Sequence, residues 1–389
     1  MKKVLLRAPL LTNSGYGVHS RQVFSWLLEE SKKRNFQFDV ECLSWGNCSW
    51  IIDNQRESGL VHQIMERSKP LEKMYDVTFQ VQLPDEWNTS LGKFNVGITA
   101  AVETDKCNPA WVDNCNKMNH VIVPSAFTKN IIKRSGVLTA DITVIPEWYN
   151  ESIEKESNCG LELNLETNLN FLIVGMMTGG LEKTDRKNIV NTIRYICEKF
   201  KDNPDVSVIV KTSMGKYSSF DKKRTREYFE SFVKAVRPNS VYPRINLLYG
   251  DMSRDEIASL FKSKEISCYV SLTRAEGYGL PIVDAAASGL PIIATNYSGH
   301  LQFLKGQKFL PVDYNLVEVP KERIDNRIFV PNTRWADPIK KSFFTSLDDL
   351  YNNYELHRQN ALVTKQHITQ NFSKNSIVEK YNEKFGSLL

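Results

Sequence analysis

Short apolar segments alternate with longer polar or amphipathic stretches along the whole chain. In the first half, VLLRAPLL, FDVECLSW, VTFQVQL, FNVGITAAV, HVIVPS and ITVIPEW have strand length, and a helix is expected near Gly17–Glu30. The second half repeats the pattern with NFLIVGM, VSVIVKT, INLLYG, ISCYVSL and LPIIATN, separated by helical segments such as KNIVNTIRYICEKF and RDEIASLFKSK. Apolar strands with connections of this length are typical of parallel, doubly wound sheets. The pattern therefore predicts an α/β protein with two Rossmann-like domains.

The length of 389 residues exceeds what a single hydrophobic core usually supports, which also favours two domains. Residues 150–170 are polar and show no sustained period, so this segment is the predicted linker. We place the boundary near Leu165, with an N-terminal domain at 1–165 and a C-terminal domain at 166–372. The last stretch, 373–389, begins with Ser373 as a helix N-cap, and we expect an amphipathic helix that packs back on the N-terminal domain.

Composition narrows the class of protein only slightly. The 50 Lys and Arg residues against 45 Asp and Glu suit an anionic ligand, but fall short of the excess expected for tight nonspecific DNA binding. Seven cysteines without a C-x-x-C pair speak against a disulfide framework or a zinc knuckle and favour a reducing cytoplasm. The start MKKVLLRAPLL continues into polar TNSGYG, and no apolar stretch has membrane-spanning length. We therefore interpret this start as a buried strand, with attachment to a membrane surface or action in an infected host cell as alternatives to a purely cytoplasmic location.

Residues 271–296, SLTRAEGYGLPIVDAAASGLPIIATN, carry the most specific pattern in the chain. A buried strand ends near Leu272, a glycine-rich turn follows, Pro281 opens a helix and Gly289 closes it. Such a unit points backbone N–H groups and the positive end of the helix dipole at one ligand position. The pattern therefore predicts a site for a phosphate group.

Two acidic residues flank this turn, Glu276 before the helix and Asp284 within it, with seven residues between them. Both carboxylates can line one ligand groove, where one accepts hydrogen bonds from sugar hydroxyls and the other from ribose hydroxyls. The chain has no D-x-D pair of the kind that holds a divalent ion against a diphosphate. We therefore expect neither a metal site nor a cofactor.

The string E-GYGLPIV-D, followed by AAASGLPI, resembles the retaining glycosyltransferases of group one, which are family four of the usual classification. The resemblance implies a GT-B fold, in which two Rossmann-like domains face a cleft. It implies that Glu276 holds the transferred sugar, that the amides of Tyr278, Gly279 and Leu280 bind phosphate and sugar, and that Asp284 binds the ribose. Asp284 departs from the family pattern, because Glu is usual at this position.

The same resemblance assigns cations to the diphosphate. NFLIVGMMTGGLEKTDRKNI is similar to the family's strand and basic element, in which Lys187, with Arg186 beside it, would neutralise the departing diphosphate. The family's second Arg is absent, since two methionines follow Gly175. Lys211 and Arg274 are the candidates to replace it. The alternative for Arg186 and Lys187 is a solvated helix start.

The N-terminal half carries weaker signals. In NSGYGVHS, Gly15 and Gly17 would let the backbone approach a ligand, which matches the family's glycine loop beside the donor phosphate and the acceptor. His19 is either a helix-face residue or a ligand contact. Glu103 is the first ionisable group after FNVGITAAV, where many family members have His; it would orient the acceptor hydroxyl, unless the following Thr and Asp simply cap a turn. Glu147 in IPEWYN is either a ligand contact or a hinge cap.

Residues 211–237 combine eight Lys or Arg with three acids and interleaved aromatic residues. A solvated helix face over a core stripe is the ordinary interpretation, and contact with DNA or a membrane is the alternative. TNSGYGVHSRQV also resembles a branch of these enzymes found in tailed-phage and bacterial genomes. The concrete form of the DNA alternative is a phage-type enzyme that glycosylates hydroxymethylated DNA bases. Such an enzyme would reach the base in a duplex by base flipping.

The predicted function is retaining transfer of a hexose or pentose from a nucleoside-diphosphate sugar, UDP-linked, to a hydroxyl of a glycan or a lipid-linked sugar. The first alternative is the modified-DNA acceptor. Others are a GT-B nucleotide-sugar epimerase or phosphorylase, and a nonenzymatic protein that binds carbohydrate or nucleic acid.

Overall fold

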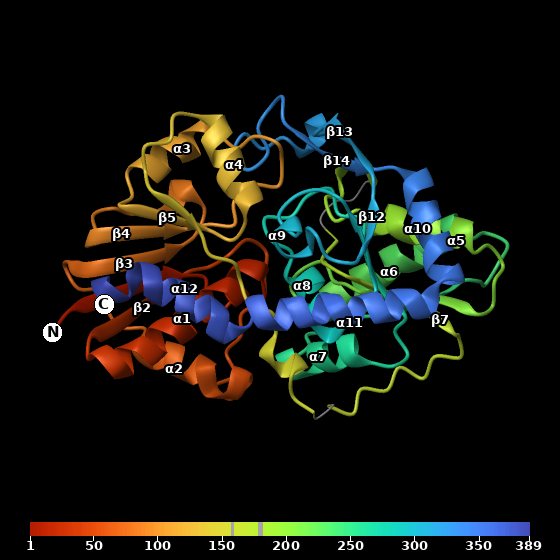
Figure 1. Ribbon diagram of the computed structural model, residues 1–389, viewed down its shortest axis with the longest axis horizontal. Helices are drawn as coiled ribbons and strands as arrows, with labels where there is room; N and C mark the ends of the chain where they lie inside the picture. The colour runs from red at the N-terminus through yellow and green to blue at the C-terminus, as the bar shows by residue number, and fades with distance from the viewer. Residues whose placement is uncertain (157–158, 178–181) are drawn as a thin grey trace. The chain divides into compact units, whose positions relative to one another are not determined.

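The computed structural model describes residues 1–156, 159–177 and 182–389. Contacts between residues divide the chain into two compact units. The first unit comprises Met1–Trp148, Asp325–Thr333 and Phe372–Leu389, and the second comprises Tyr149–Ile324 and Arg334–Asn371. Each unit contains its own sheet with helices packed on it (Figure 1).

Within the described residues, the sheet of the first unit has six parallel strands in the order β2-β1-β3-β4-β5-β6. The strands are β1 (Lys3–Ala8), β2 (Gln37–Cys42), β3 (Tyr75–Val81), β4 (Gly92–Ile98), β5 (His120–Val123) and β6 (Ile142–Val144). The helices of this unit are α1 (Gly15–Arg34), α2 (Leu60–Arg67), α3 (Pro109–Asn116), α4 (Ala126–Ser135) and α12 (Lys374–Phe385). These strands and α1 lie where the apolar pattern predicted them.

Helix α1 begins and ends for local reasons. Ser14 is its N-cap, and the Ser14 hydroxyl accepts a hydrogen bond from the amide of Gly17 at 2.9 Å. Asn35 follows the last turn in the left-handed conformation, with φ of 53°. The helix buries Trp26 and Leu27 completely, so its apolar face covers the sheet.

Helix α12 completes the first unit, although it follows the whole second unit in the chain. The rings of Trp26 in α1 and Tyr381 in α12 stack at 4.6 Å between centroids, and Trp26 Nε1 donates to Asn382 at 2.8 Å. Phe385 packs edge-on against Phe79 of the sheet. Figure 1 shows α12 beside α1. The structure thus places the C-terminal helix with the N-terminal domain, as we expected.

The described part of the second unit holds another six-stranded parallel sheet, in the order β12-β11-β10-β7-β8-β9. Its strands are β7 (Leu169–Val174), β8 (Val206–Lys211), β9 (Arg244–Leu248), β10 (Cys268–Ser271), β11 (Ile292–Thr295) and β12 (Leu310–Val312). Its helices include α5 (Ile189–Lys199), α6 (Ser219–Val236), α7 (Arg254–Lys262), α8 (Leu280–Ser288) and α9 (Leu301–Leu304). Two parallel sheets with flanking helices confirm the predicted α/β class.

Several elements of the second unit escaped the sequence pattern. A two-stranded antiparallel ribbon joins β13 (Tyr314–Glu318) and β14 (Arg334–Pro338), and two helices, α10 (Lys340–Asn352) and α11 (Tyr354–Asn371), follow it. Helix α11 buries only three residues over its length, which is too few for a clear helical period.

Between β13 and β14, the chain contributes residues 325–333 to the first unit. Ile328 packs there against the core, and Arg327 Nε lies 2.6 Å from Asp85.

The division between the units falls at Trp148–Tyr149, earlier than the predicted boundary near Leu165. Hydrogen bonds hold the following polar segment against the second unit. The Asn150 side chain donates to the Arg254 carbonyl at 2.6 Å, and the Leu165 amide donates to Glu265 at 2.7 Å. These bonds join residues about a hundred positions apart, so the local pattern could not reveal them. Residues 157 and 158 of the predicted linker lie outside the described residues.

None of the helices in the described part of the chain combines the length and the apolar character that a membrane crossing requires.

The stacked pair of Trp26 and Tyr381 makes α12 testable as part of the first unit. We expect Tyr381→Ala to lower the free energy of unfolding of this unit by about 3 kcal/mol, because it removes a fully buried ring. Tryptophan fluorescence in a urea titration measures this, since six of the seven tryptophans belong to the first unit. Val137→Ala, at a side chain 83% exposed, serves as the control, with a change within about 0.5 kcal/mol. Equal unfolding curves for both variants would contradict the assignment of α12.

Candidate functional site

Helix α8 follows a glycine turn that opens directly after β10. Gly279 is its N-cap with φ of 106°, a conformation that favours glycine, and Pro281 stands in the first turn. A Cβ at Gly279 would also lie 3.1 Å from the His300 side chain. No side chain in the described part of the chain caps this helix end. The N-terminus of α8 therefore has the glycine turn and the proline that the sequence predicted, and anion binding there stays a prediction.

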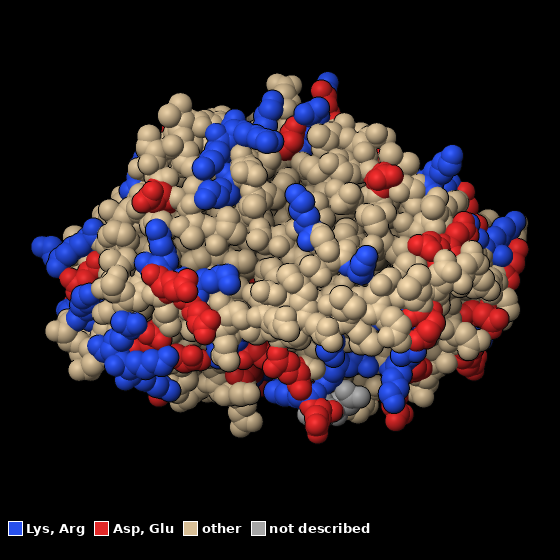
Figure 2. Space-filling view, in the orientation of Figure 1, with Lys and Arg blue, Asp and Glu red and all other residues tan. Residues whose placement is uncertain are grey.

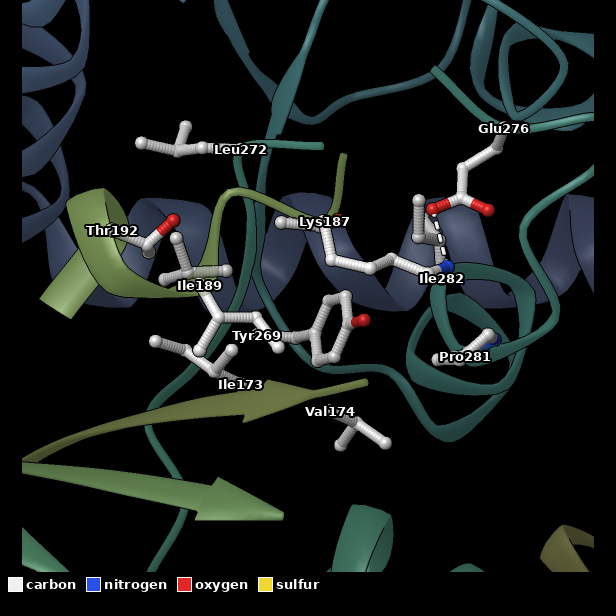
Figure 3. Close-up of a pocket in the computed structure, with 12 residues that line it drawn as sticks. Ile173, Val174, Lys187, Ile189, Thr192, Tyr269, Leu272, Glu276, Pro281 and Ile282 are labelled. Atoms are coloured by element: carbon white, nitrogen blue, oxygen red, sulfur yellow. Dashed lines mark hydrogen bonds and ion pairs between the residues drawn. The ribbon is translucent and has the colours of Figure 1, made fainter. Parts of the chain in front are cut away.

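Glu276 lies just before this helix and is bound from three sides. Its carboxylate lies 2.6 Å from Lys187 Nζ (Figure 3). It also lies 3.4 Å from Arg186 and accepts a hydrogen bond from the Thr273 hydroxyl at 2.9 Å. The Glu276 amide donates to the Ser298 hydroxyl at 2.9 Å. The residue is only 8% exposed. The structure thus brings together three of the predicted site residues.

The charge of Glu276 is fixed by its neighbours. Burial alone would raise the pKa of its carboxyl, but Lys187 and Arg186 together lower that pKa to about 2. Glu276 is therefore ionised at any physiological pH. Because a carboxylate of such low pKa is a weak base, its chemistry is to accept hydrogen bonds rather than protons.

Arg186 and Lys187 belong to a fixed turn before α5. The Asp185 carboxylate accepts hydrogen bonds from the amides of Lys187 and Ile189, at 3.1 and 2.8 Å. Arg186 donates to the Ala275 carbonyl at 2.6 Å and is 8% exposed. The alternative of a solvated helix start is therefore wrong, since both side chains turn inward to Glu276.

Lys187 and Glu276 line a small cavity beside apolar side chains (Figure 3). Its other walls come from β7, α5, β10 and α8, and include Ile173, Val174, Ile189, Thr192, Tyr269, Leu272, Pro281 and Ile282. This small cavity lies near the carboxyl ends of β7 and β10, the edge at which open parallel sheets bind ligands.

Asp284 has a different environment from Glu276. Its carboxylate accepts the backbone N–H of Asn150 at 2.8 Å. Burial raises the pKa of Asp284 to about 6, although this hydrogen bond and the charge of Arg254 oppose the rise. One carboxylate oxygen is therefore engaged with the backbone, and the ribose contact stays a prediction.

The two other candidate cations have partners of their own. Lys211, at the end of β8, donates to the Gly250 carbonyl at 2.5 Å, and its burial lowers its pKa to about 8. Arg274 is 4% exposed and pairs with Asp337 at 3.0 Å. These contacts do not place Lys211 or Arg274 beside Glu276. Their roles in binding a diphosphate therefore stay predictions.

The candidates of the N-terminal half lie in the first unit. Gly15 and Gly17 are in the first turn of α1, and a Cβ at Gly17 would lie 2.0 Å from the Thr12 carbonyl oxygen. Gly17 is therefore required by backbone packing within this unit. Gly15 has open space around it, so a ligand contact at this glycine stays a prediction. Glu103 is partly buried in the loop after β4.

His19 and Glu147 are both buried, with His19 Nδ1 3.9 Å from the Glu147 carboxylate. His19 is thus an interior residue of α1, and burial lowers its pKa to about 4.

Thr273 and Ser298, beside the turn, were not singled out by the sequence. Thr273 and Ser298 hold Glu276 as described, and His300 Nε2 lies 2.7 Å from the Thr295 carbonyl oxygen with the ring fully buried. Ser298 and His300 lie in the loop after β11, and Gly299 packs there against the Gly277 backbone. Nothing in the local sequence marks these contacts. In the described ranges, no cluster of three His, Cys, Asp or Glu side chains could hold a metal ion.

The raised pKa of Asp284 predicts a pH dependence of stability. The folded protein binds this proton more tightly than the unfolded chain, so the contribution is complete below pH 3.8 and is lost as the pH rises through about 6. We expect the free energy of unfolding of Asp284→Asn, minus that of the unaltered protein, to rise by about 1 to 3 kcal/mol between pH 4 and 7.5. Urea titrations followed by circular dichroism measure this difference.

Asp255→Asn is the matched control, because hydrogen bonds from Ser152 and Lys155 lower the pKa of the Asp255 carboxyl. The contribution of the ionised Asp255 carboxylate to the free energy of unfolding is already present at pH 4 and stays nearly constant to pH 7.5. A relative stability of Asp284→Asn that does not change with pH would contradict the buried, protonatable state of Asp284.

Comparisons with known proteins match one segment of the chain to a family model and the whole chain to a fold. Residues 246–325, which include Glu276, α8 and Asp284, match the family model described as glycosyl transferases group 1. No curated protein matches the chain.

Three solved structures span nearly the same length. Sucrose-phosphate synthase from Thermosynechococcus elongatus has 13% identity and a TM-score of 0.64, with 100% of this chain and 99% of that chain covered. The α,α-trehalose 6-phosphate synthase from Burkholderia multivorans has 9% identity and a TM-score of 0.64, with 100% and 98% covered. HepE from Anabaena, solved in complex with UDP and glucose, has 11% identity and a TM-score of 0.64, with both chains covered completely.

At these identities the likeness shows the fold, which is the two-domain GT-B fold. The family match over the α8 segment and this fold together support a GT-B glycosyltransferase.

Proposed function

We propose that the protein transfers a sugar, with retention of configuration, from a UDP-linked sugar to a hydroxyl group of a glycan or a lipid-linked sugar. The observation that carries this proposal is the buried, ionised Glu276, which lies between Lys187 and Arg186 just before the N-terminus of α8. The group 1 match over this segment supports it, as does the UDP and glucose complex of the similar HepE.

The donor diphosphate would bind at the N-terminus of α8, where backbone amides and the helix dipole favour negative charge. Lys187 lies 2.6 Å from Glu276 without ligand, so a diphosphate would share or take over this ammonium group. As the bond between the sugar carbon and the phosphate oxygen breaks, negative charge grows on the leaving diphosphate. Lys187 and Arg186 would then stabilise the departing group.

Glu276 would accept hydrogen bonds from hydroxyl groups of the transferred sugar. Its pKa of about 2, which the two cations maintain against burial, makes it a poor acceptor for the proton of the incoming hydroxyl. That proton would instead pass to an oxygen of the leaving phosphate, on the face of the sugar from which the phosphate departs. Attack on this same face retains the configuration of the sugar.

The contacts of helix α6 favour a glycan or lipid-linked acceptor over DNA. Phe229 and Phe232 are buried, so one face of α6 packs on the core. The helix also pairs Lys223 with Glu227 and Arg226 with Glu230. On the face seen in Figure 2, Lys and Arg side chains are mixed with Asp and Glu. The buried face and the two ion pairs of α6 support a solvated helix face, while a DNA acceptor stays the alternative.

Lys187→Ala tests the diphosphate site. We expect binding of UDP to weaken about tenfold or more, while binding of uridine changes little. The reason is that Lys187 would contact only the diphosphate, which uridine lacks. Isothermal titration calorimetry measures both ligands, and repeating it with a chelator tests the expected metal independence.

The control for Lys187→Ala is Lys183→Ala, because Lys183 is four residues away and pairs at 2.5 Å with Glu322 instead of Glu276. Equal losses for UDP and uridine would indicate a damaged fold. A strict requirement for added magnesium or manganese would contradict the metal-independent site.

Glu276→Gln tests the sugar contact. We expect turnover to fall about a hundredfold, while UDP binds as well or better, because Lys187 loses a competing carboxylate. The assay is transfer from a panel of UDP-sugars to glycans, lipid-linked sugars and hydroxymethylated DNA, at two salt concentrations.

Full turnover of Glu276→Gln would reject the role of Glu276. Transfer by the unaltered protein to DNA alone, falling steeply with salt, would favour the DNA alternative. Accumulation of an epimerised donor without transfer would favour the epimerase, and binding without any turnover would favour a nonenzymatic protein.

A further inference from the structure

Arg274 lies two residues before Glu276, yet its guanidinium group is directed to protein atoms. Nη1 donates to the carbonyl oxygen of Glu182 at 3.1 Å and also to that of Asp185. Nε and Nη2 donate to the Asp337 carboxylate at 3.2 and 3.0 Å. The group also lies over the Trp335 ring, 5.4 Å from its centroid. One side chain therefore links the turn before α5 to strand β14.

The backbone of Arg274 makes the same connection. Its amide donates to the Arg186 carbonyl at 2.9 Å, and its own carbonyl accepts the Ala336 amide at 3.0 Å. Arg274 is thus hydrogen-bonded on one side to the residue before Lys187 and on the other side to β14. Since Glu276 follows two residues later, these bonds join both members of the Lys187–Glu276 pair.

The turn at 182–188 depends on such outside contacts. A short 3-10 helix spans Glu182–Thr184, and Asn188 precedes α5 in the left-handed conformation, with φ of 55°. The Asp185 carboxylate accepts hydrogen bonds from backbone amides at the end of the turn. The backbone carbonyl groups of Glu182 and Asp185 accept hydrogen bonds from Arg274. Without the guanidinium group, the Glu182 and Asp185 carbonyls would lose a charged donor in a buried place, which is costly.

We propose that Arg274 is a positioning residue, which fixes Lys187 against Glu276 by bridging the 182–185 carbonyl groups and Asp337. The inference rests on the proposed function, in which Lys187 meets the diphosphate and Glu276 meets the sugar. It differs from a direct role of Arg274 as a phosphate ligand. A lysine cannot replace this arginine, because one ammonium group does not offer the planar fork that serves two carbonyl groups and a carboxylate together.

The first test separates binding from turnover. In Arg274→Lys, we expect UDP affinity within about threefold of the unaltered protein, but turnover of a UDP-sugar about ten- to a hundredfold lower, because small displacements of reacting groups are costly. The control is Arg194→Lys, since Arg194 pairs with the side chain of the same Glu182 without contacting the Asp185 carbonyl or Asp337. Its turnover should stay within about twofold.

The second variant, Asp337→Asn, keeps the size of the side chain and removes its charge. We expect a smaller loss of turnover than in Arg274→Lys, and no further loss when the two changes are combined, because the residues act as one unit. Full additivity, or turnover of Arg274→Lys within twofold of the unaltered protein, would overturn the proposal. A large loss of UDP affinity at unchanged turnover would also overturn it and make Arg274 a direct ligand.

Hydrogen exchange without ligand distinguishes failure of this inference from failure of the proposed function. We expect the amides of Lys187 and Ile189, which bond to Asp185, to exchange about tenfold faster in Arg274→Lys than in Arg194→Lys. Unchanged exchange would reject the bridge. If the unaltered protein binds no UDP, the proposed donor fails, while this comparison still decides whether Arg274 positions the turn.

Discussion

The second unit is arranged around a carboxylate that is kept charged in a place where water hardly reaches it. Burying Glu276 as an ion costs free energy that only close cations and hydrogen-bond donors can offset. Lys187, Arg186 and Thr273 supply them at 2.6, 3.4 and 2.9 Å. Because these partners come from two segments about ninety residues apart, both segments must be held rigidly.

The two acids of the sequence signature are thus opposites in their chemistry. Glu276 meets cations and stays ionised, whereas Asp284 meets a backbone amide and is easier to protonate. Spacing along the chain placed both correctly near α8, but only the surroundings determine their charge. A ligand that brings hydroxyl groups to Glu276 and to Asp284 would therefore meet a stronger hydrogen-bond acceptor at Glu276.

The sequence was sufficient for the parts of the fold that depend on local pattern. Strands such as β8 and β10 are largely apolar and buried, and Pro281 and Gly289 mark the ends of α8 within a residue or two. It could not reveal bonds between distant residues. Arg274 and Asp337 are 63 positions apart, and the bond from Leu165 to Glu265 shifts the boundary between the units. For the same reason, the ribbon β13–β14 and the partners of Lys211 were not predicted.

Helix α12 packs on α1 through Trp26 and Tyr381, although the whole second unit lies between them in the chain. During synthesis on a ribosome, α1 and its sheet therefore emerge long before the helix that covers them. The second unit has all of its residues available first, so it can complete its fold while the apolar face of Trp26 still lacks its final cover. Over that interval, the nascent first unit presents aromatic surface on which chaperones, or a second nascent chain, can act.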